Sequence, residues 1–422
     1  MNIKNILTVI ASLIFVVAIT EIALGVYFKL NEDIWVWQND IAQTPRERPG
    51  RDKQPRMKLL PYFGQIMRPG WTPSEDWTKD YIKKHLLLDD DPDWWEIQAN
   101  NYGFQSAYDY PYARKDNDEL IIGIFGGSVA RNLAVESLTH FQAEFERLFP
   151  NKKVILLNLA GGGYKQPQQL LILSYFLSIG QEFDYVINVD GFNEAWVGWY
   201  NINEHGISPL MPFAGFVYGL QNYLAGERTG AGLETIAPLL SRFSTILDRS
   251  HTATGHLFAK VINKTLNNYK HEAYNEFGKR RDGLNYATIM LKADQDYNAA
   301  VIKIAETWRN ASIAMHTLLA KQGIRYVHAI QPNQYFTDRE FSEAESKIAF
   351  TDNFPFKQIV ATAYPLMLRE SEALKKAGVD FIDATLLIRD LPGQIFSDNC
   401  CHFTKSGSDA LIDFILESMQ NP

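Results

Sequence analysis

The sequence predicts an α/β protein with three layers, in which a five-stranded parallel sheet is covered by helices on both faces. After residue 118, short apolar runs rich in β-branched residues recur, and such runs are typical of strands buried on both faces. Stretches with helical periodicity separate most of these runs, which indicates a doubly wound sheet. The predicted strands are 120–125, 153–160, 184–190, 324–330 and 379–384.

Helix boundaries support this alternation. Phe141 and Phe145 fall on one face of a segment that Pro150 ends, and Pro167 opens a segment that ends at Gly180. A crossover helix is expected over 296–322. The helices before the fourth and fifth strands end in lysines followed by a glycine, as helix C-termini commonly do. These positions are Lys321 with Gly323, and Lys375 and Lys376 with Gly378.

The connection between the third and fourth strands is far longer than a crossover requires. It predicts a mainly helical insertion over about 195–295. Within it, the strongly apolar segment 209–226 has two interpretations. It packs on the core or on the region 59–118, or it forms a lid or a membrane-facing surface.

The N-terminal residues 1–30 predict a transmembrane anchor. Glu21 is the single strongly polar side chain in 6–28, and a helix of that length reaches roughly 34 Å, enough to span a hydrocarbon core. A cleavable signal peptide is the alternative, because Ala23 and Gly25 form a small-x-small pair. Both interpretations place the remaining chain outside the cytoplasm, in the periplasm or at the cell surface.

Two segments connect this helix to the sheet. Residues 31–58 include a polar, charged and proline-bearing stretch that predicts a tether, and 59–118 form an aromatic-rich extension without a clear period. The net charge of −8 excludes nucleic acid as a partner, because phosphates require clustered Lys and Arg. The cysteines, Cys400 and Cys401, are adjacent and indicate neither a disulfide framework nor a zinc site.

Polar residues follow the strands at the carboxyl edge of the sheet, where ligands bind in this class of fold. Ser128 follows two glycines after the first strand, so the backbone can turn sharply and present both its hydroxyl and its amide. Three glycines, 161–163, follow the second strand, and Asn193 follows the third. After the last strand comes His402, with Asp398 shortly before it, which makes this histidine the candidate base.

Together these residues resemble the four sequence blocks of the SGNH, or GDSL-type, hydrolase family. "FGGSVA", "NLAGGGYKQPQQ", "DGFNE" and "DNCCHFT" stand in the chain order of its serine, glycine, asparagine and histidine blocks, across 119–190 and 296–419. "NNYGFQS" also looks like the lead-in of membrane-anchored bacterial members.

The resemblance implies a flavodoxin-like fold and a serine esterase or acyltransferase. Ser128 would be the nucleophile, His402 the base and Asp398 the acid, while Ser128, Gly163 and Asn193 would form the oxyanion hole. No metal and no organic cofactor is implied. The expected substrate is an ester-bearing small molecule, glycan or lipid of the cell envelope.

Three positions depart from the family pattern. Gly127 and Glu194 stand where the family carries aspartates, and Asp398 lies four residues before His402 instead of three. Asn399 occupies the expected position of the acid. We favour Asp398 over Asn399 because only a carboxylate can both accept the imidazole N–H and stabilise an imidazolium.

Two other functions are open at this stage. An α/β-hydrolase would require a G-x-S-x-G elbow, but Ala130 replaces its second glycine. A membrane-anchored binding or scaffold protein could keep the fold without the chemistry, because a fold does not fix a function.

Overall fold

The computed structural model describes residues 3–32, 35–37, 56–75, 96–217, 233–248, 250–279 and 291–420. Within three helices, the side chains at 3–11, 13–14, 32, 233–239, 241 and 267–279 are outside this description. The chain divides into two compact units. The first comprises residues 1–48 and 221–288, and the second comprises 49–220 and 289–422.

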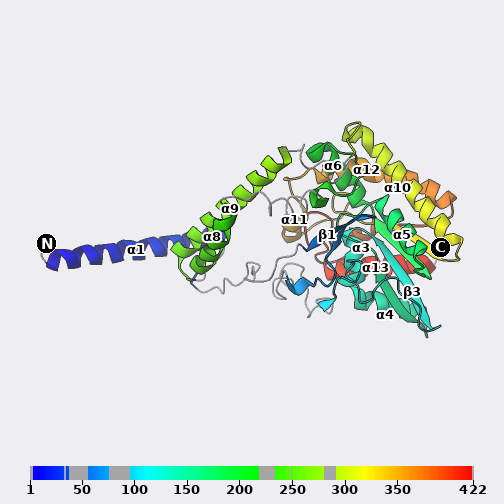
Figure 1. Ribbon diagram of the computed structural model, residues 1–422, viewed down its shortest axis with the longest axis horizontal. Helices are drawn as coiled ribbons and strands as arrows, with labels where there is room; N and C mark the ends of the chain where they lie inside the picture. The colour runs from blue at the N-terminus through cyan, green and yellow to red at the C-terminus, as the bar shows by residue number, and fades with distance from the viewer. Residues whose placement is uncertain are drawn as a thin grey trace. The chain divides into compact units, whose positions relative to one another are not determined.

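The second unit contains the predicted five-stranded sheet (Figure 1). Its strands are β3 (Glu119–Gly126), β4 (Lys153–Asn158), β5 (Tyr185–Asp190), β6 (Arg325–Ile330) and β7 (Asp380–Asp383). They are ordered β4-β3-β5-β6-β7, and every neighbouring pair is parallel. The strand order reverses at β3, and its carboxyl end is therefore the place where this class of sheet binds ligands.

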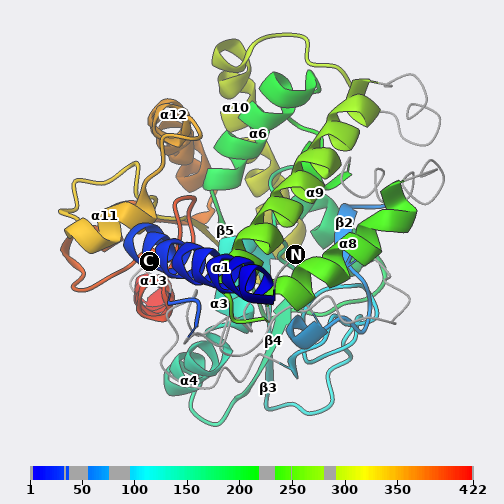
Figure 2. The ribbon, with the colours of Figure 1, turned by 90° about the vertical axis from the view of Figure 1, so that its left-hand side faces the viewer.

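Helices cover both faces of the sheet (Figures 1 and 2), which confirms the three-layer prediction. One layer consists of α3 (Ser128–Val135), α4 (Leu138–Leu148) and α13 (Lys405–Gln420). The other consists of α5 (Gln168–Ser178), α6 (Phe192–His205), α10 (Tyr297–Ala320) and α12 (Phe356–Lys376). The short helix α11 (Glu343–Ala349) and the 3₁₀ turn η4 (Leu387–Asp390) lie in the connections.

Burial on both faces accounts for the apolar strands. Every residue of β3 is buried, and the strand therefore reads as a continuous apolar run instead of an alternating one. Gly126 ends the strand with φ of +138°, and a Cβ there would lie 2.0 Å from the carbonyl oxygen of Val189. Only glycine allows this close approach of β3 to β5, directly before Ser128.

The extension before the sheet packs onto the second unit. It begins with an antiparallel hairpin of β1 (Met57–Leu60) and β2 (Gly64–Met67), followed by the turn η1 (Pro73–Glu75). The buried hydroxyl of Tyr110 donates to the carbonyl of Asn158, 2.7 Å away, at the end of β4. The extension thereby contacts the strand end that precedes the glycine loop.

The chain leaves and re-enters the second unit at one place. After α6, Ile207 forms an antiparallel bridge with Lys292. The amide of Ser208 donates to Leu291 O (2.7 Å), and that of Ala293 donates to Gly206 O (3.0 Å). The segment between these ends contributes α8 (Leu233–Asp248) and α9 (Ala253–Lys279) to the first unit.

Only part of the apolar segment 209–226 is described. Asn201 of α6 holds it, because the side-chain amide of Asn201 donates to Met211 O (3.0 Å) and accepts from the amide of Ala214 (3.0 Å). Residues 209–217 therefore pack on the second unit, as the first interpretation expects. Residues 218–226 lie outside the described residues.

The first unit contains α1 (Ile3–Glu32), α8 and α9. Glu21 of α1 accepts hydrogen bonds from the first turn of α9, including those from Thr254 N (3.0 Å) and Thr254 Oγ1 (2.6 Å). Phe28 and Ala253 are buried in a small apolar cluster between these two helices.

The transmembrane helix predicted over 1–30 is not found. Among the residues that the structure describes, no helix has both the length and the hydropathy of a membrane span. A long helix, α1 (Ile3–Glu32), does form over these residues. Most of the tether predicted over 31–58 lies outside the described residues.

Candidate active site

The structure brings three predicted residues together at the carboxyl edge of the sheet. Ser128 is the first residue of α3 and follows β3 through a two-glycine turn. His402 lies in the loop before α13, which the Phe396–Phe403 bridge closes. Nε2 of His402 lies 2.7 Å from Oγ of Ser128.

Asp398 occupies the other side of the imidazole. Its Oδ2 makes a short hydrogen bond with Nδ1 of His402. Its Oδ1 accepts from three backbone amides of the same loop, those of Cys400 (3.0 Å), Cys401 (3.0 Å) and His402 (3.2 Å). The loop thus folds around the Asp398 carboxylate, and this accommodates the spacing of four residues.

Two other residues, Asn399 and the acid Asp383 at the end of β7, could have been partners of the imidazole, and both make other contacts. The carbonyl oxygen of Asn399 accepts from the hydroxyl of Tyr335 (2.9 Å). Asp383 accepts from the amide (3.0 Å) and hydroxyl (2.6 Å) of Thr385, closing a local turn at the end of β7. The structure therefore places Asp398, and neither alternative, against His402.

The contact between Asp398 and His402 shifts the pKa values of both residues. Burial raises the pKa of Asp398, but the charge and the hydrogen bond of His402 outweigh it and lower that pKa to about 2. Burial lowers the pKa of His402, but Asp398 outweighs it and raises that pKa to about 9. In the neutral imidazole, Nδ1–H faces the carboxylate and Nε2 can accept the Ser128 proton.

A second acid near His402 was not predicted from the sequence. Glu136, at the end of α3, also raises the pKa of His402. Arg131 pairs with Glu136 at 2.5 Å and reaches Gln105 of the extension at 3.3 Å. The sequence spacing could have indicated Arg131, because Arg131 lies one helical turn after Ser128 and so on the same face. It does not indicate Glu136.

Asn193 and the glycine loop meet beside Ser128. The side-chain amide of Asn193 donates to the carbonyl of Tyr164 (2.9 Å), which directly follows Gly163. A Cβ at Gly127 would lie 2.2 Å from Nδ2 of Asn193. With Asn193 in this position, a larger side chain at 127 would displace its amide, which bears on the first departure from the family pattern.

The backbone turns sharply at the glycine loop, and α3 begins at Ser128. Gly163 has φ of +74°, which favours glycine, and its neighbour Tyr164 donates to Gly161 O at 3.1 Å to close the turn. The amide of Ser128 lies in the first turn of α3, where amides have no partner within the helix.

Glu194 stands where the family pattern carries an aspartate, which is the second departure. It is buried, and its carboxylate accepts from the amides of Gln166 and Gly191, both at 2.9 Å. Burial raises the pKa of Glu194, and burial lowers that of the neighbouring buried Lys165. The glutamate ties the segment after the glycine loop to the start of α6, which carries Asn193.

His328 is interpreted as structural from its strand position, and its contacts are those of a buried core residue. Its Nε2 lies 2.9 Å from Asp190 and its Nδ1 lies 2.7 Å from Ser312, with all three side chains buried. Trp308 also donates to Asp190, at 2.7 Å.

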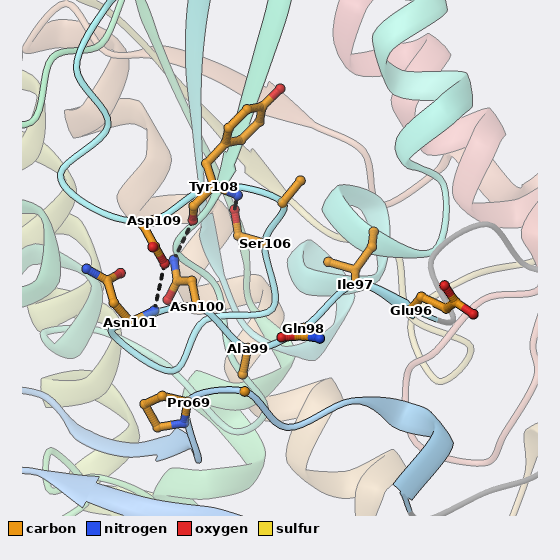
Figure 3. Close-up of a pocket in the computed structure, with 12 residues that line it drawn as sticks. Pro69, Glu96, Ile97, Gln98, Ala99, Asn100, Asn101, Ser106, Tyr108 and Asp109 are labelled. Atoms are coloured by element: carbon orange, nitrogen blue, oxygen red, sulfur yellow. Dashed lines mark hydrogen bonds between the residues drawn. The ribbon is translucent and has the colours of Figure 1, made fainter.

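A separate hollow of about 710 Å³ lies in the extension (Figure 3). It is lined by residues 69–70, 96–101 and 106–109, and none of the five predicted site residues lines it. The side chain of Asp109 accepts from the amide of Asn101 at 3.0 Å, so these two lining residues are hydrogen-bonded to each other (Figure 3).

No family model and no curated protein matches the chain. Among solved structures, a GDSL-like lipase from Bacteroides thetaiotaomicron is similar, with 10% identity over 74% of this chain and 92% of that one, at a TM-score of 0.34. An acetyl xylan esterase, AlAXEase, has 12% identity over 72% and 98%, at 0.35. The lipase/acylhydrolase from Enterococcus faecalis has 9% identity over 72% and 96%, at 0.34. The interpretation of the site depends on the contacts within this chain.

Proposed function

We propose that this chain is a serine ester hydrolase, or an acyltransferase of the same chemistry, of the SGNH/GDSL type. One observation carries the proposal: His402 joins the hydroxyl of Ser128, at 2.7 Å, to the carboxylate of Asp398. Such a chain of contacts lets a weak hydroxyl act as a nucleophile, because the base takes its proton as it attacks.

In the first half-reaction, Ser128 Oγ attacks the carbonyl carbon of the ester while its proton passes to Nε2 of His402. Asp398 stabilises the imidazolium and holds its tautomer. The tetrahedral intermediate then expels the alcohol, which takes the proton from Nε2 and leaves an acyl group on Ser128. Water in a hydrolase, or a sugar hydroxyl in a transferase, attacks this acyl-enzyme with His402 again as the base.

The developing oxyanion requires donors that are already in position. The proposed donors are the amides of Ser128 and Gly163 and the side chain of Asn193. The contact of Asn193 with Tyr164 and the closeness of its amide to Gly127 support this assignment, because they join the segments that carry all three donors.

The proposed substrates are O-acyl esters of cell-envelope glycans or lipids. Half-buried aromatic side chains on and after α6 support a substrate with an extended apolar face. Trp196 and Trp199 stack with ring centroids 5.5 Å apart. Phe213 and Phe216 approach the glycine loop, since a Cβ at Gly163 would lie 3.0 and 3.3 Å from them.

We also propose that the protein is held at a membrane through its N-terminal helix, with the catalytic unit outside the cytoplasm. Support comes from the described side chains of α1, which are largely apolar and exposed. Phe15, Val17 and Leu30 are 65%, 64% and 79% exposed. A helix that is apolar on most of its surface is stable when lipid or protein covers it.

A fluorophosphonate probe tests the chemistry. We expect it to label the folded protein at Ser128, and we expect Ser128→Ala to abolish labelling while the circular dichroism spectrum stays unchanged. Labelling that persists in the variant would assign the nucleophile to another residue. Folded wild-type protein that remains unlabelled would favour the scaffold alternative, a protein with this fold and no chemistry.

A further inference from the structure

Three metal-ligating side chains lie together in the loop that carries the histidine. One ligand atom from each of Cys400, Cys401 and His402 lies within 4.8 Å of the other two. Both cysteines are free thiols. We propose that these three side chains bind a thiophilic divalent cation such as Zn²⁺, and that the bound cation inhibits the enzyme. The binding stands on the geometry alone, whereas the inhibition rests on the function proposed above.

Asp398 creates this arrangement. Adjacent residues in extended backbone point to opposite sides, so neighbouring cysteines ordinarily cannot share one ion. Here Oδ1 of Asp398 accepts from three amides in a row and folds the loop into a turn. The two thiols and the imidazole are thereby gathered within reach of one point.

The donor set suits zinc. Zn²⁺ prefers thiolate sulfur at about 2.3 Å and imidazole nitrogen at about 2.0–2.1 Å, which separates tetrahedral ligands by roughly 3.5–3.8 Å. The observed limit of 4.8 Å requires only a small inward movement of the side chains. Cys400 is partly exposed and the His402 side chain is 27% exposed, so an ion can reach the site from solvent.

Charge and protons balance without a further reactant. Zn²⁺ displaces one proton from each thiol and one from the imidazole where it is protonated; these protons go to solvent, and the two thiolates neutralise the ion. Asp398 remains a carboxylate throughout. Water or the hydroxyl of Ser128 can complete the four-coordinate site.

Inhibition follows from the positions of the ring nitrogens. Nδ1 of His402 faces Asp398 and Nε2 faces Ser128, so both are already used. A cation on Nε2 removes the proton acceptor of Ser128, and a cation on Nδ1 breaks the contact that orients the ring. Either way the general base is lost, which typically contributes about 100- to 10,000-fold in rate.

Binding is measured on full-length Ser128→Ala protein, which keeps all three ligands and needs no activity. With Cd²⁺ as a spectroscopic probe and a phosphine reductant present, we expect thiolate-to-metal absorption that saturates at one ion per chain. Excess Zn²⁺ should displace the probe. The same titration in Ser128→Ala with Cys400→Ser should show weaker binding, and adding Cys401→Ser should abolish the absorption. Unchanged binding in that last protein, or no absorption in Ser128→Ala, would overturn the proposal.

Inhibition is measured as the rate of fluorophosphonate labelling with and without saturating Zn²⁺, expressed as a ratio within each protein. For wild type we expect a loss of about 100-fold or more, reversed by a chelator, given the usual contribution of a general base. In Cys400→Ser, the loss of labelling rate that saturating Zn²⁺ causes should be severalfold smaller.

His140→Ala is the matched control. His140 pairs with Asp413 at 2.7 Å and its side chain is also 27% exposed, so it offers an alternative site for zinc. This variant should keep the full sensitivity. Sensitivity lost in His140→Ala and kept in Cys400→Ser would contradict the proposed site. Protein without zinc that never labels would instead contradict the proposed function and leave the cadmium titration to decide the binding.

Discussion

At the scale of single residues, Asp398 does two things with its two carboxylate oxygens. Oδ2 contacts the imidazole of His402, and Oδ1 closes the loop that positions the same imidazole. The charge that stabilises an imidazolium and the geometry that presents it therefore come from one side chain. Asparagine at 398 would keep the oxygen that closes the loop and lose the charge.

This separation predicts the behaviour of two neighbouring variants. We expect Asp398→Asn to lower kcat by roughly 10,000-fold, as a wrong imidazole tautomer does in a serine protease triad, and to remove the stabilisation that the carboxylate gives to protonated His402. Asn399→Ala should lower kcat far less, because the contact of Asn399 with Tyr335 is through its backbone carbonyl, which alanine keeps. Turnover of a chromogenic acyl ester and thermal unfolding measure both effects. If Asn399→Ala is the more damaging change, Asp398 is not the acid.

The raised pKa of His402 predicts the pH dependence. Only neutral imidazole accepts the Ser128 proton, so kcat/KM of chelator-treated protein should rise with pH, reach half of its maximum at about pH 9, and level off above that pH. In Asp398→Asn the residual kcat/KM should level off at lower pH, because the main cause of the raised pKa is gone. If kcat/KM rises at the same pH in both proteins, a group other than His402 titrates.

The raised pKa of His402 affects the free energy of unfolding in the opposite direction, because this contribution falls as the pH rises. The folded-state pKa of His402 lies above its ordinary value of 6.5, so protonated His402 stabilises the fold most fully below pH 6.5. This contribution is lost as the pH rises through about 9. Catalysis and this term of stability therefore favour opposite ends of the pH range.

Much of the site could be predicted because strand ends are predictable. Ser128, Asn193 and His402 each follow a strand, and parallel strands present their carboxyl ends at one edge. The acid was harder to assign, because its position depends on a loop held by backbone hydrogen bonds that no periodic pattern encodes. Glu136 was missed for a similar reason, since its closeness to His402 depends on tertiary packing.

At the scale of elements, α6 carries Asn193 and begins at Gly191, where Glu194 caps it. Glu194 also accepts from Gln166, so one buried side chain fixes the helix start and the segment after the glycine loop. This cross-link sets the relation between two proposed oxyanion donors, Asn193 and Gly163.

Removing Glu194 should therefore affect both stability and turnover. Glu194→Ala leaves two buried amides without an acceptor, at a cost of about 1–3 kcal/mol each in the free energy of unfolding. Glu194→Gln keeps one acceptor oxygen and should lose about half as much. Urea unfolding measures the stability, and kcat measures the displacement of Asn193. Wild-type stability in both variants would show that the cap is dispensable.

The elements themselves could be predicted where burial is uniform. The five strands were located to within a few residues, because strands buried on both faces give continuous apolar runs. The N-terminal prediction of a helix is confirmed, whereas no helix that could span a membrane is found among the described residues. Hydropathy alone does not reveal that Glu21 accepts from the first turn of α9, more than two hundred residues later in the sequence.

At the scale of the whole molecule, each of the two units is made from stretches distant in sequence. The second unit contains all of the proposed catalytic residues, and the first contains α1 with its exposed apolar side chains. The proposed chemistry and the proposed membrane association therefore belong to different units.

This division predicts the result of a fractionation. Full-length protein should sediment with membranes and stay there after an alkaline wash, because α1 exposes apolar surface. A variant lacking 1–30 should appear in the soluble fraction and still label at Ser128, which reports that the second unit is folded. Full-length protein in the soluble fraction would contradict the membrane proposal, and a natural form beginning after Gly25 would establish a cleaved signal peptide.

The bridge between Ile207 and Lys292 has a consequence for how such a chain can evolve. Because the two backbone ends are hydrogen-bonded to each other, the five-stranded sheet constrains where the intervening chain departs and returns, and not how long it is. The entropy of closing a loop grows slowly, by about 0.6 kcal/mol for each doubling in length. Recombination at this point can exchange an entire helical module without altering the register of any strand, so one scaffold can acquire different attachments.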